Sequence, residues 1–352
     1  MKIIVNTKEI QNAIKNLLKV APKKPSAEIL NSVKIEANNG SVLLTATDQQ
    51  MSVHLTLKEF EILEPGVTIL PRDGVKFITK LTENQMTITE HDIQSGKRVV
   101  KYSSFNPNNY PLRANRKYNK EAFTLNSDNI NRLLDVTYAC SNSESTPILQ
   151  SVLIRGNVIA ATDRYRLAMN KLVENKYEKD LTIHSNAINL IPAFADKKYK
   201  GDYTFTVDEN ESYIQIKFDS IEMEVLITDG SYPNIERIIP QDFKTEVKIS
   251  KSELIEELKI MKDVVPTKTK IIKLDVANSK LSLLGENEGN SLTSEINTYV
   301  SGENICVGVN LDYMLDAIQS VNLKEITLKF NGALSPLMIE DNAIVLPYRI
   351  AS

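Results

Sequence analysis

The group of residues in this chain best suited to chemistry is Asp163 with Arg164 and Arg166. A carboxylate beside two guanidiniums could hold a charged substrate for hydrolysis. Hydrolysis also needs a nucleophile paired with a base, and the sequence offers no such pair. An aspartate of this kind more often accepts hydrogen bonds from the backbone amides of a turn. A hydrolase site and a turn-capping aspartate both stay open, and the hydrolase is the less favoured of the two.

The histidines and cysteines form no recognisable metal or catalytic motif. His54, His91 and His184 each lie in an alternating apolar and polar stretch, typical of a solvent-facing residue on a strand, and none has a second histidine at metal-ligand spacing. Cys140 and Cys306 lie far apart and form no Cys-x-x-Cys pair, so a reducing cytoplasm fits better than a disulfide framework or a zinc site. We expect no metal, no cofactor and no catalytic residue.

Length and composition are those of an ordinary soluble protein. Of 352 residues, 42 are Lys or Arg and 45 are Asp or Glu, which gives a net charge of −3, and 42% are apolar. The length predicts two or three domains. No stretch approaches the roughly 18 apolar residues of a membrane span, and the apolar stretch Ile3–Val5 is too short for a signal peptide. We expect a cytoplasmic protein with no membrane partner.

One unit of sequence is repeated along the whole chain. Each unit is a short alternating strand, a helix-capping residue, a helix and further strands. The caps are spaced 55 to 65 residues apart, and most are Asn or Ser, whose side chains accept hydrogen bonds from free amides at a helix start. Proline also suits a first turn, where its missing N–H is not needed. The six caps are Asn6, Pro71, Asn126, Ser185, Ser250 and Asn310.

Taken two at a time, these units predict three similar domains. The first two share an Ala-Thr-Asp motif, at Ala46–Asp48 and Ala161–Asp163, and each ends in a Tyr-Pro pair, at Tyr110 and Tyr232, followed by a linker-like stretch. Hairpins with half-buried alternation predict antiparallel strands. We therefore expect an α+β fold in which each domain packs two helices on mainly antiparallel sheets. The expected domains are residues 1–117, 118–241 and 242–352.

Positive charge concentrates on the first two expected helices. On a helix of about 100° per residue, Lys8, Lys15 and Lys19 fall within about 40° of one another, opposite the apolar face. We call these three residues the lysine stripe. Basic residues gathered on one class of element in an acidic protein favour a phosphate-facing surface without base recognition, although a solvated helix face is the simpler alternative. The expected DNA-facing residues are Lys8, Lys15, Lys19, Lys23, Lys24, Arg72, Lys76 and Lys80.

The threefold repeat, together with three motifs, resembles the bacterial sliding clamp family, the beta subunit of DNA polymerase III. The motifs are Ala161–Ala168, Tyr232–Pro240, and Ile339–Asp341 followed by Val345–Ile350. They span the chain in the family's order. The resemblance implies a head-to-tail homodimeric ring that encircles double-stranded DNA without sequence preference and has no catalysis of its own.

The resemblance also implies partners that insert a short linear motif into a pocket. These partners are the replicative DNA polymerase alpha-type subunit, the clamp loader, other polymerases and repair proteins. Apolar walls would bury a partner side chain while arginines meet a polar group or carboxylate. The expected pocket residues are Leu149, Thr162, Arg164, Tyr165, Arg166, Leu167, Pro233, Arg237, Ile238, Ile344, Val345, Leu346, Pro347, Tyr348 and Arg349. The expected dimer interface is Val100, Tyr102, Val264 and Val265.

One departure from the family pattern concerns the pocket directly. Members usually carry a small pair such as Gly-His after the aspartate, where this chain has Arg164 and Tyr165. A larger, charged side chain there is expected to narrow the pocket or change its peptide preference. A repeat-built interaction scaffold without nucleic acid is the alternative of another class. It would be a monomer or an open oligomer and would not depend on the lysine stripe.

Overall fold

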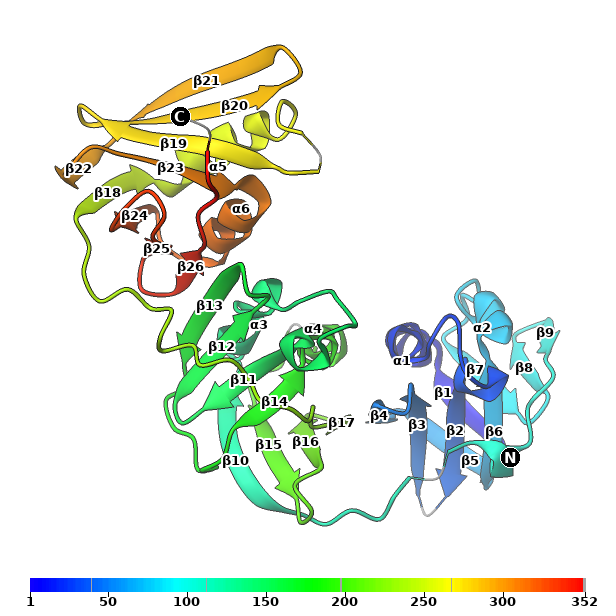
Figure 1. The fold of residues 1–352 in the computed structure, drawn as a ribbon. Coiled ribbons are helices and arrows are strands. Elements are labelled where there is room, and N and C mark those ends of the chain that lie inside the picture. Colours follow the sequence, from blue (N-terminus) through cyan, green and yellow to red (C-terminus); the bar gives the residue numbers. More distant parts are fainter. Residues whose placement is uncertain (39, 112, 197, 267, 351–352) are drawn as a thin grey trace. The chain divides into compact units, whose positions relative to one another are not determined.

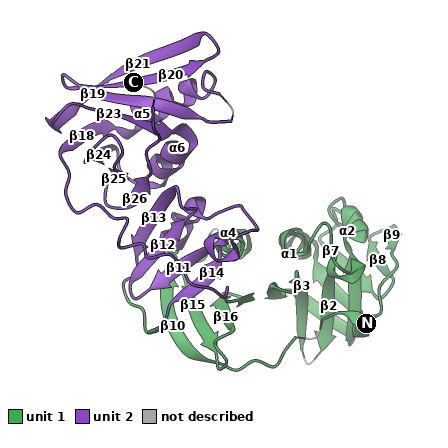
Figure 2. Cartoon of the chain, in the orientation of Figure 1, with its two compact units in different colours: residues 1–130, 174–178, 186–227 green, residues 131–173, 179–185, 228–352 purple. Residues whose placement is uncertain are grey.

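The computed structural model describes residues 1–38, 40–111, 113–196, 198–266 and 268–350. They form two compact units (Figures 1 and 2). Unit 1 comprises residues 1–130, 174–178 and 186–227, and unit 2 comprises residues 131–173, 179–185 and 228 onward. None of the described helices is long and apolar enough to cross a membrane. The two units do not follow the three expected domains one by one, and the boundaries near 117 and 241 stay a prediction.

The described residues contain six α-helices, each preceded by a strand, as the repeated unit predicts. The helices are α1 (Thr7–Val20), α2 (Arg72–Ile78), α3 (Asn131–Leu134), α4 (Ser185–Phe194), α5 (Lys251–Met261) and α6 (Leu311–Ser320). Asn6 caps α1, Ser250 caps α5 and Asn310 caps α6, each through a side-chain oxygen that accepts from a backbone amide. Ser185 is instead the first residue of its helix.

The third helix is much shorter than the others. Asn126 does accept hydrogen bonds from the amides of Asp128 and Asn129, at 3.1 and 3.0 Å, but a turn follows before α3 begins. Ser, Asp and Asn side chains compete for backbone groups and favour turns over helix interiors. The polar stretch after Asn126 therefore shortens this unit's helix to four residues.

Unit 1 contains two antiparallel sheets. The five-stranded sheet has the order β5-β1-β7-β8-β9, with β5 (Phe60–Glu64), β1 (Lys2–Asn6), β7 (Gln85–Thr89), β8 (Asp92–Ser95) and β9 (Arg98–Lys101). The eight-stranded sheet has the order β10-β15-β16-β17-β4-β3-β2-β6, with β10 (Tyr118–Asn126), β15 (Asp202–Asp208), β16 (Tyr213–Phe218), β17 (Ile221–Leu226), β4 (Met51–Thr56), β3 (Ser41–Thr47), β2 (Ser32–Asn38) and β6 (Gly66–Pro71).

Unit 2 also contains two antiparallel sheets. The nine-stranded sheet has the order β14-β11-β12-β13-β26-β25-β24-β18-β22, with β14 (Leu181–His184), β11 (Ser151–Arg155), β12 (Val158–Thr162), β13 (Arg166–Lys171), β26 (Ala343–Val345), β25 (Leu337–Ile339), β24 (Glu325–Phe330), β18 (Thr245–Ser250) and β22 (Tyr299–Gly302). The four-stranded sheet has the order β21-β20-β19-β23, with β21 (Asn290–Asn297), β20 (Lys280–Asn287), β19 (Ile271–Ala277) and β23 (Ile305–Asn310).

Two strand pairings carry a sheet across an expected domain boundary. In unit 1, β4 pairs with β17, from Leu55 opposite Ile221 to Met51 opposite Val225. In unit 2, β13 pairs with β26, and Leu167 lies opposite Ile344. The α+β class with antiparallel sheets is confirmed, while the sequence repeat did not reveal that neighbouring repeats share one sheet.

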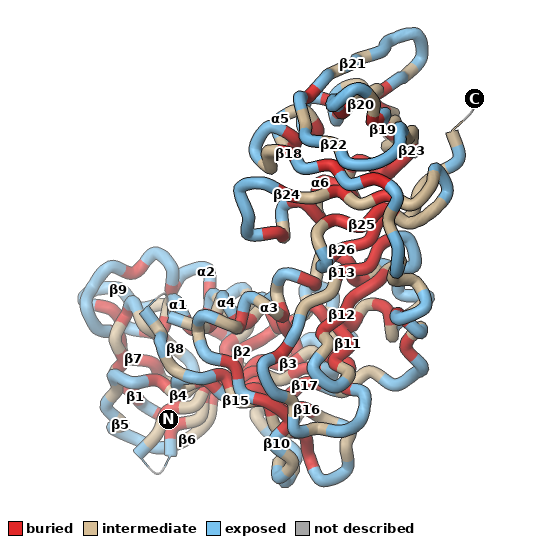
Figure 3. Tube along the Cα trace, turned by 90° about the vertical axis from the view of Figure 1, so that its left-hand side faces the viewer, coloured by how far each residue is buried: buried red, intermediate tan, exposed pale blue. Residues whose placement is uncertain are grey.

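The apolar faces of the helices pack on these sheets (Figure 3). In α1, Ile10, Ile14 and Leu17 are fully buried, as the expected apolar face requires. In unit 2, α5 and α6 bury Leu258 and Ile318 in one core with the strands around them. Burying a Leu or Ile side chain stabilises a fold by about 1.5–3 kcal/mol. These cores hold the backbone turns that carry the candidate site.

Candidate functional site

The Ala-Thr-Asp motif forms a tight turn between β12 and β13. The hydroxyl of Thr162 donates to the carbonyl of Arg166 at 2.6 Å and accepts from the amide of Arg164 at 3.1 Å. Asp163 Oδ1 accepts from the amides of Tyr165 and Arg166, at 2.9 and 3.1 Å. Asp163 is thus the turn-capping aspartate that the sequence left open, and its carboxylate is engaged by the backbone.

The first Ala-Thr-Asp motif repeats this turn between β3 and β4. The hydroxyl of Thr47 donates to the carbonyl of Met51 at 2.9 Å, and Asp48 Oδ1 accepts from the amides of Gln50 and Met51. Gln49 has φ +76° and Arg164, at the matching place, has φ +80°. A left-handed conformation is uncommon for residues other than glycine. The shared motif is therefore explained by a shared turn geometry.

The second shared motif, Tyr-Pro, ties the chain back to these turns. The Tyr232 hydroxyl accepts from the amide of Thr162 at 3.2 Å and donates to the carbonyl of Ser151 at 3.3 Å. Tyr110 donates to the carbonyl of Thr45 at 3.3 Å. Burial raises the pKa of both phenols, so they stay neutral donors over the physiological range.

Arg166 lies inside the structure and its charge is already compensated. It is 9% exposed, with Nε 3.0 Å from Asp163 Oδ2 and Nη1 2.6 Å from Asp316 Oδ2. Its guanidinium carbon also lies 4.5 Å from the ring centroid of Tyr313 and 5.4 Å from that of Tyr138. Arg166 therefore joins β13 to α6. Its charge is thus paired within unit 2, and its expected role at the rim of the pocket stays a prediction.

The apolar residues of the expected pocket do gather in unit 2. We call them, with their neighbours, the apolar cluster: Leu149, Leu153, Ala160, Leu167, Tyr232, Ile235, Met338 and Ile344, with Ile238 packed against it. The β13–β26 pairing brings Leu167 and Ile344 together from distant parts of the sequence. Val345 is fully buried in the core that α5 and α6 share, so it does not line the pocket. Thr162, 2% exposed, supports the turn instead.

The C-terminal segment crosses this region and is tied down at two points. The amide of Leu346 donates to the carbonyl of Tyr165 at 2.9 Å, and the amide of Tyr348 donates to the carbonyl of Gly308 at 2.8 Å. Leu346, Pro347 and Tyr348 are half-buried. The ring of Tyr165 stacks on Tyr313, with centroids 6.4 Å apart and planes at 24°. Sequence reasoning did not select Tyr313. The available signal was its position in the first turn of α6, three residues after the cap Asn310.

A cavity lies at the opposite end of β13 from the turn. It has a volume of about 710 Å³, and Val158, Met169, Ile235, Ile239 and Met338 form its apolar lining. All five belong to the apolar cluster or pack against it. The cluster is therefore accessible at this end of the strand as well.

The lysine stripe has the exposure that the sequence predicts. Lys8, Lys15 and Lys19 are exposed on α1, and Lys23 and Lys24 are exposed in the loop that follows. The apolar side of the helix is buried. A basic face on a net acidic chain suits contact with phosphates.

The second helix contributes less positive charge than expected. The Arg72 guanidinium donates to the carbonyls of Leu18 and Ala21, at 2.9 and 2.6 Å, and so caps the end of α1. Burial lowers the pKa of Arg72 from its usual value. Lys76 pairs with Asp73 at 2.8 Å, and Lys80 lies beyond the end of α2. Of Arg72, Lys76 and Lys80, only Lys76 is an exposed residue of α2, and the DNA-facing set stays a prediction.

The four expected interface residues differ in how far their side chains are buried. Tyr102 is 9% exposed and its hydroxyl donates to the carbonyl of Thr89 at 2.6 Å, and Val265 is 5% exposed. Both side chains thus pack within their own unit. Val100 and Val264 are half-buried.

Three other apolar side chains on α2, β9 and α5 are about half exposed. They are Phe77 on α2, Val99 on β9 and Ile260 on α5, at 50%, 55% and 47% exposure. β9 is also an edge strand, whose unpaired backbone groups can take a further strand. Sequence reasoning missed these three residues because a helical or strand pattern does not tell which apolar side chains the rest of the fold covers.

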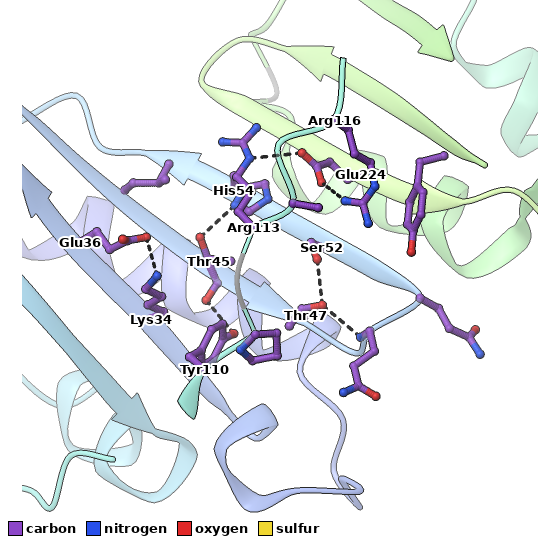
Figure 4. A pocket seen from close by; sticks show the side chains of 16 residues that line it. Lys34, Glu36, Thr45, Thr47, Ser52, His54, Tyr110, Arg113, Arg116 and Glu224 are labelled. Atoms are coloured by element: carbon purple, nitrogen blue, oxygen red, sulfur yellow. Dashed lines mark hydrogen bonds and ion pairs between the residues drawn. The ribbon is translucent and has the colours of Figure 1, made fainter. Parts of the chain in front are cut away.

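Unit 1 contains a second, smaller cavity of about 180 Å³ beside the β4–β17 pairing (Figure 4). Arg113 pairs with Glu222 and, at 3.2 Å, with Glu224, which also meets Arg116 at 3.1 Å. His54 lines this cavity and is 3% exposed, with Nδ1 2.9 Å from the hydroxyl of Thr45. These ion pairs connect the 113–116 segment to β17.

The expectation that all three histidines face solvent is wrong for His54. Because β17 pairs alongside β4, His54 is covered, and burial lowers its pKa to about 4, with a smaller contribution from the charge of Arg113. His91 is exposed in the turn between β7 and β8, and His184 is half-buried in β14. Among the residues that the structure describes, no group of three or more His, Cys, Asp or Glu could hold a metal ion.

Comparisons with known proteins match both ends of the chain. The model for the N-terminal domain of the DNA polymerase III beta subunit matches residues 1–114, and that for the C-terminal domain matches residues 236–344. Together these ranges cover well over half of the chain. The beta sliding clamp of Staphylococcus epidermidis is 26% identical over 368 aligned positions, which cover 96% of each protein.

Solved structures agree on the fold. The DNA polymerase sliding clamp from Bacillus subtilis has a TM-score of 0.91 at 22% identity and covers 100% of both chains. A sliding clamp from Bartonella birtlesii bound to griselimycin has a TM-score of 0.92 at 20% identity, with 99% of this chain and 100% of that chain covered. At these identities the likeness establishes the fold.

Proposed function

Because this chain belongs to the family of bacterial DNA polymerase III beta subunits, the sliding clamps, we propose that two copies form a closed ring around duplex DNA. The ring tethers the replicative polymerase to its template and makes synthesis processive. It performs no catalysis, because retention on DNA comes from the closed ring. Nothing in this role needs a metal or a cofactor.

The observation that carries this proposal is the lysine stripe on α1. Three exposed lysines on one face of a helix, in a chain of net charge −3, favour an electrostatic surface directed at phosphates. The stripe has no aromatic residue and α1 contains no arginine, so its lysines suit the phosphate backbone rather than base edges. Exposed charges are screened within about 8 Å at physiological salt. Direct affinity is therefore weak, and a ring that encloses DNA does not need more.

We propose that partners bind where the apolar cluster meets the 163–165 turn and the C-terminal segment. Exposed or half-buried Tyr165, Ile238 and Leu346 offer an apolar surface there, above buried Leu167 and Ile344. Such a surface suits one or two apolar side chains of a short extended segment. The replicative polymerase alpha-type subunit, the clamp loader, other polymerases and repair proteins are the expected partners.

The test compares circular and linear DNA. The protein is loaded onto a nicked circular plasmid by its clamp loader and passed through a gel filtration column at moderate salt. We expect it to stay with the circle and to leave after the plasmid is cut once, because a ring slides off an end. Equal retention on circular and cut plasmid would favour a conventional basic-surface binder. A strictly monomeric protein that never loads would favour an interaction scaffold.

A further inference from the structure

Three exposed arginines lie on the segments that form the proposed partner site, and none has a carboxylate partner. Arg164 lies in the turn before β13, Arg237 lies next to Ile238 of the apolar surface, and Arg349 lies in the C-terminal segment. Within the described parts of the chain, no ion pair joins any of the three to an acidic residue. We call these three residues the arginine rim.

Four acidic residues on the segments next to the arginine rim are already in ion pairs. Asp163 and Asp316 both bind Arg166. Glu236 lies 3.6 Å from Arg155, and Asp341 lies 2.7 Å from Lys329. Arg166 is shared by two of these carboxylates, and Arg155 also pairs with Asp180. With the arginine rim included, these groups are six cations and five carboxylates, a small positive excess in a chain of net charge −3.

The backbone holds the arginine rim close to the apolar surface. The turn that carries Arg164 is fixed by the hydrogen bonds of Thr162 and Asp163. The Leu346 amide bonds to the carbonyl of Tyr165, the residue after Arg164, so turn and C-terminal segment run side by side at this point. Arg349 follows three residues later, a reach of about 10 Å for an extended chain. A peptide of a few residues can therefore meet apolar and cationic groups together.

Arg164 also occupies a backbone conformation that does not favour it. Its φ is +80°, in the left-handed region where glycine is the least strained residue. The matching turn places Gln49 at φ +76°, so the turn itself demands this conformation and a long side chain is compatible with it. A glycine at 164 would fit the backbone better. Because the residue is arginine instead, the turn carries a guanidinium group.

We propose that the arginine rim makes this site select partner segments with acidic side chains beside their apolar anchors, and that Arg164 sets this preference. The proposal rests on the proposed function, since it requires that the site takes a linear partner segment. Guanidinium groups bind carboxylates through two parallel hydrogen bonds. Each exposed pair changes affinity by about two- to fivefold, and the combined field also favours the encounter with acidic segments.

The test selects ligands from a displayed library of random dodecapeptides. The wild-type chain is compared with Arg164→Gly, Arg164→Glu and the control Lys171→Glu, which makes the same charge change as Arg164→Glu at the other, exposed end of β13. We expect wild type and Lys171→Glu to enrich acidic peptides. Arg164→Gly should lose most of that bias and Arg164→Glu should lose or reverse it. Glycine suits the left-handed backbone at this position, so the Arg164→Gly variant should fold normally. A weaker preference for acidic peptides in this variant would then come from the lost guanidinium.

Affinity measurements then separate this proposal from the proposed function. The most enriched peptide and its Asp→Asn analogue are titrated by fluorescence polarisation against wild type, Arg164→Gly and Ile238→Ser. Binding should fall with Ile238→Ser, and the advantage of Asp over Asn should shrink about two- to fivefold in Arg164→Gly. An unchanged acidic preference in both Arg164 variants overturns the selectivity proposal. If no peptide is enriched, or binding ignores Ile238→Ser, the proposed partner site itself fails.

Discussion

Arg166 is enclosed by two carboxylates and two aromatic rings, and these contacts give it a structural role within unit 2. Asp163 reaches it from its own turn, Asp316 from α6, and the ring of Tyr313 covers one face. The sequence places Asp163 three residues away, so that contact could be anticipated. Asp316 is 150 residues away, and no local pattern links the two. Sequence reasoning therefore found the residue but not its contact with α6, and its place in the pocket stays a prediction.

Replacing Arg166 by Met should destabilise the fold of unit 2. Removing one member of a buried ion pair leaves the others without compensation, although Asp316 is 42% exposed and keeps part of its hydration. We expect a loss of about 2 kcal/mol, seen in calorimetry as a Tm lower by roughly 4–8 °C. Arg237→Met, at an exposed position, is the control and should leave Tm within a degree or two. Equal Tm values for the two variants would contradict the role given to Arg166.

His54 gives the chain a pH dependence of known sign. The pKa of His54 is about 4 in the folded state, against about 6.5 in an unfolded chain. As pH falls below 6.5, the unfolded state binds this proton first, so stability declines between pH 6.5 and 4 and changes no further below 4. The loss from this residue reaches about 2 kcal/mol by pH 5. Above pH 6.5 the contribution is complete.

The measurement compares Tm at pH 7 and pH 5 for wild type, His54→Gln and His91→Gln. His54→Gln should lose less Tm over this interval than wild type, because its side chain takes up no proton. His91 is exposed, so His91→Gln should behave as wild type does. A pH response that is the same in all three proteins would show that His54 is not buried as described.

At the scale of secondary-structure elements, local signals predicted the helix caps well, whereas the pairings between distant strands were not predicted at all. Asn6 and Asn310 cap their helices through contacts two or three residues away, which a sequence displays directly. The pairings of β4 with β17 and of β13 with β26 join residues that are more than 150 positions apart. β4 and β17 alternate apolar and polar residues like any half-buried strand, whereas β13 and β26 do not. Neither pattern identifies the strand with which it pairs. The candidate pocket was reached through family motifs rather than through strand patterns.

Gly308 controls where the C-terminal segment can lie. A Cβ at this position would come within 2.6 Å of Ile350 Cγ2 and 2.9 Å of the Tyr348 carbonyl oxygen. Gly308→Ala should therefore push the segment off β23 and disturb Leu346 at the proposed partner site. We expect peptide affinity to fall at least tenfold, measured by fluorescence polarisation, with little change in Tm. Gly156→Asn, in open space at φ +52°, is the control and should bind as wild type does. Undiminished binding by Gly308→Ala would mean that the segment does not form the site.

At the scale of the whole molecule, the exposed apolar side chains are the guide to assembly. Phe77 and Val99 in unit 1 and Ile260 in unit 2 are about half exposed, and Val99 and Ile260 lie within four residues of the expected interface positions Val100 and Val264. Together with the edge strand β9 they mark two surfaces on one chain that a head-to-tail dimer would join. The expected interface residues Tyr102 and Val265 are buried in their own units and are poorer choices for a test.

Changing Val99 to Asp should therefore convert a dimer into monomers. A carboxylate at the centre of an apolar seam loses hydration without gaining a partner. Light scattering should give a mass near twice 39.6 kDa for the wild type and half that value for the variant. The control is Leu226→Asp, at a strand position that is 39% exposed, and this variant should stay dimeric. A dimeric Val99→Asp protein would place the seam elsewhere.

The two pairings that cross the expected boundaries also determine where the chain is stiff. Five pairs of facing residues join β4 to β17, and three join β13 to β26. Bending the chain at either place would therefore break several backbone hydrogen bonds together. Each chain then resists bending at both places. In a ring built from two such chains, we therefore expect bending away from these two sheet junctions, for example at the contacts between copies. A machine that opens the ring would meet less resistance at a seam between subunits than at either sheet junction within one subunit.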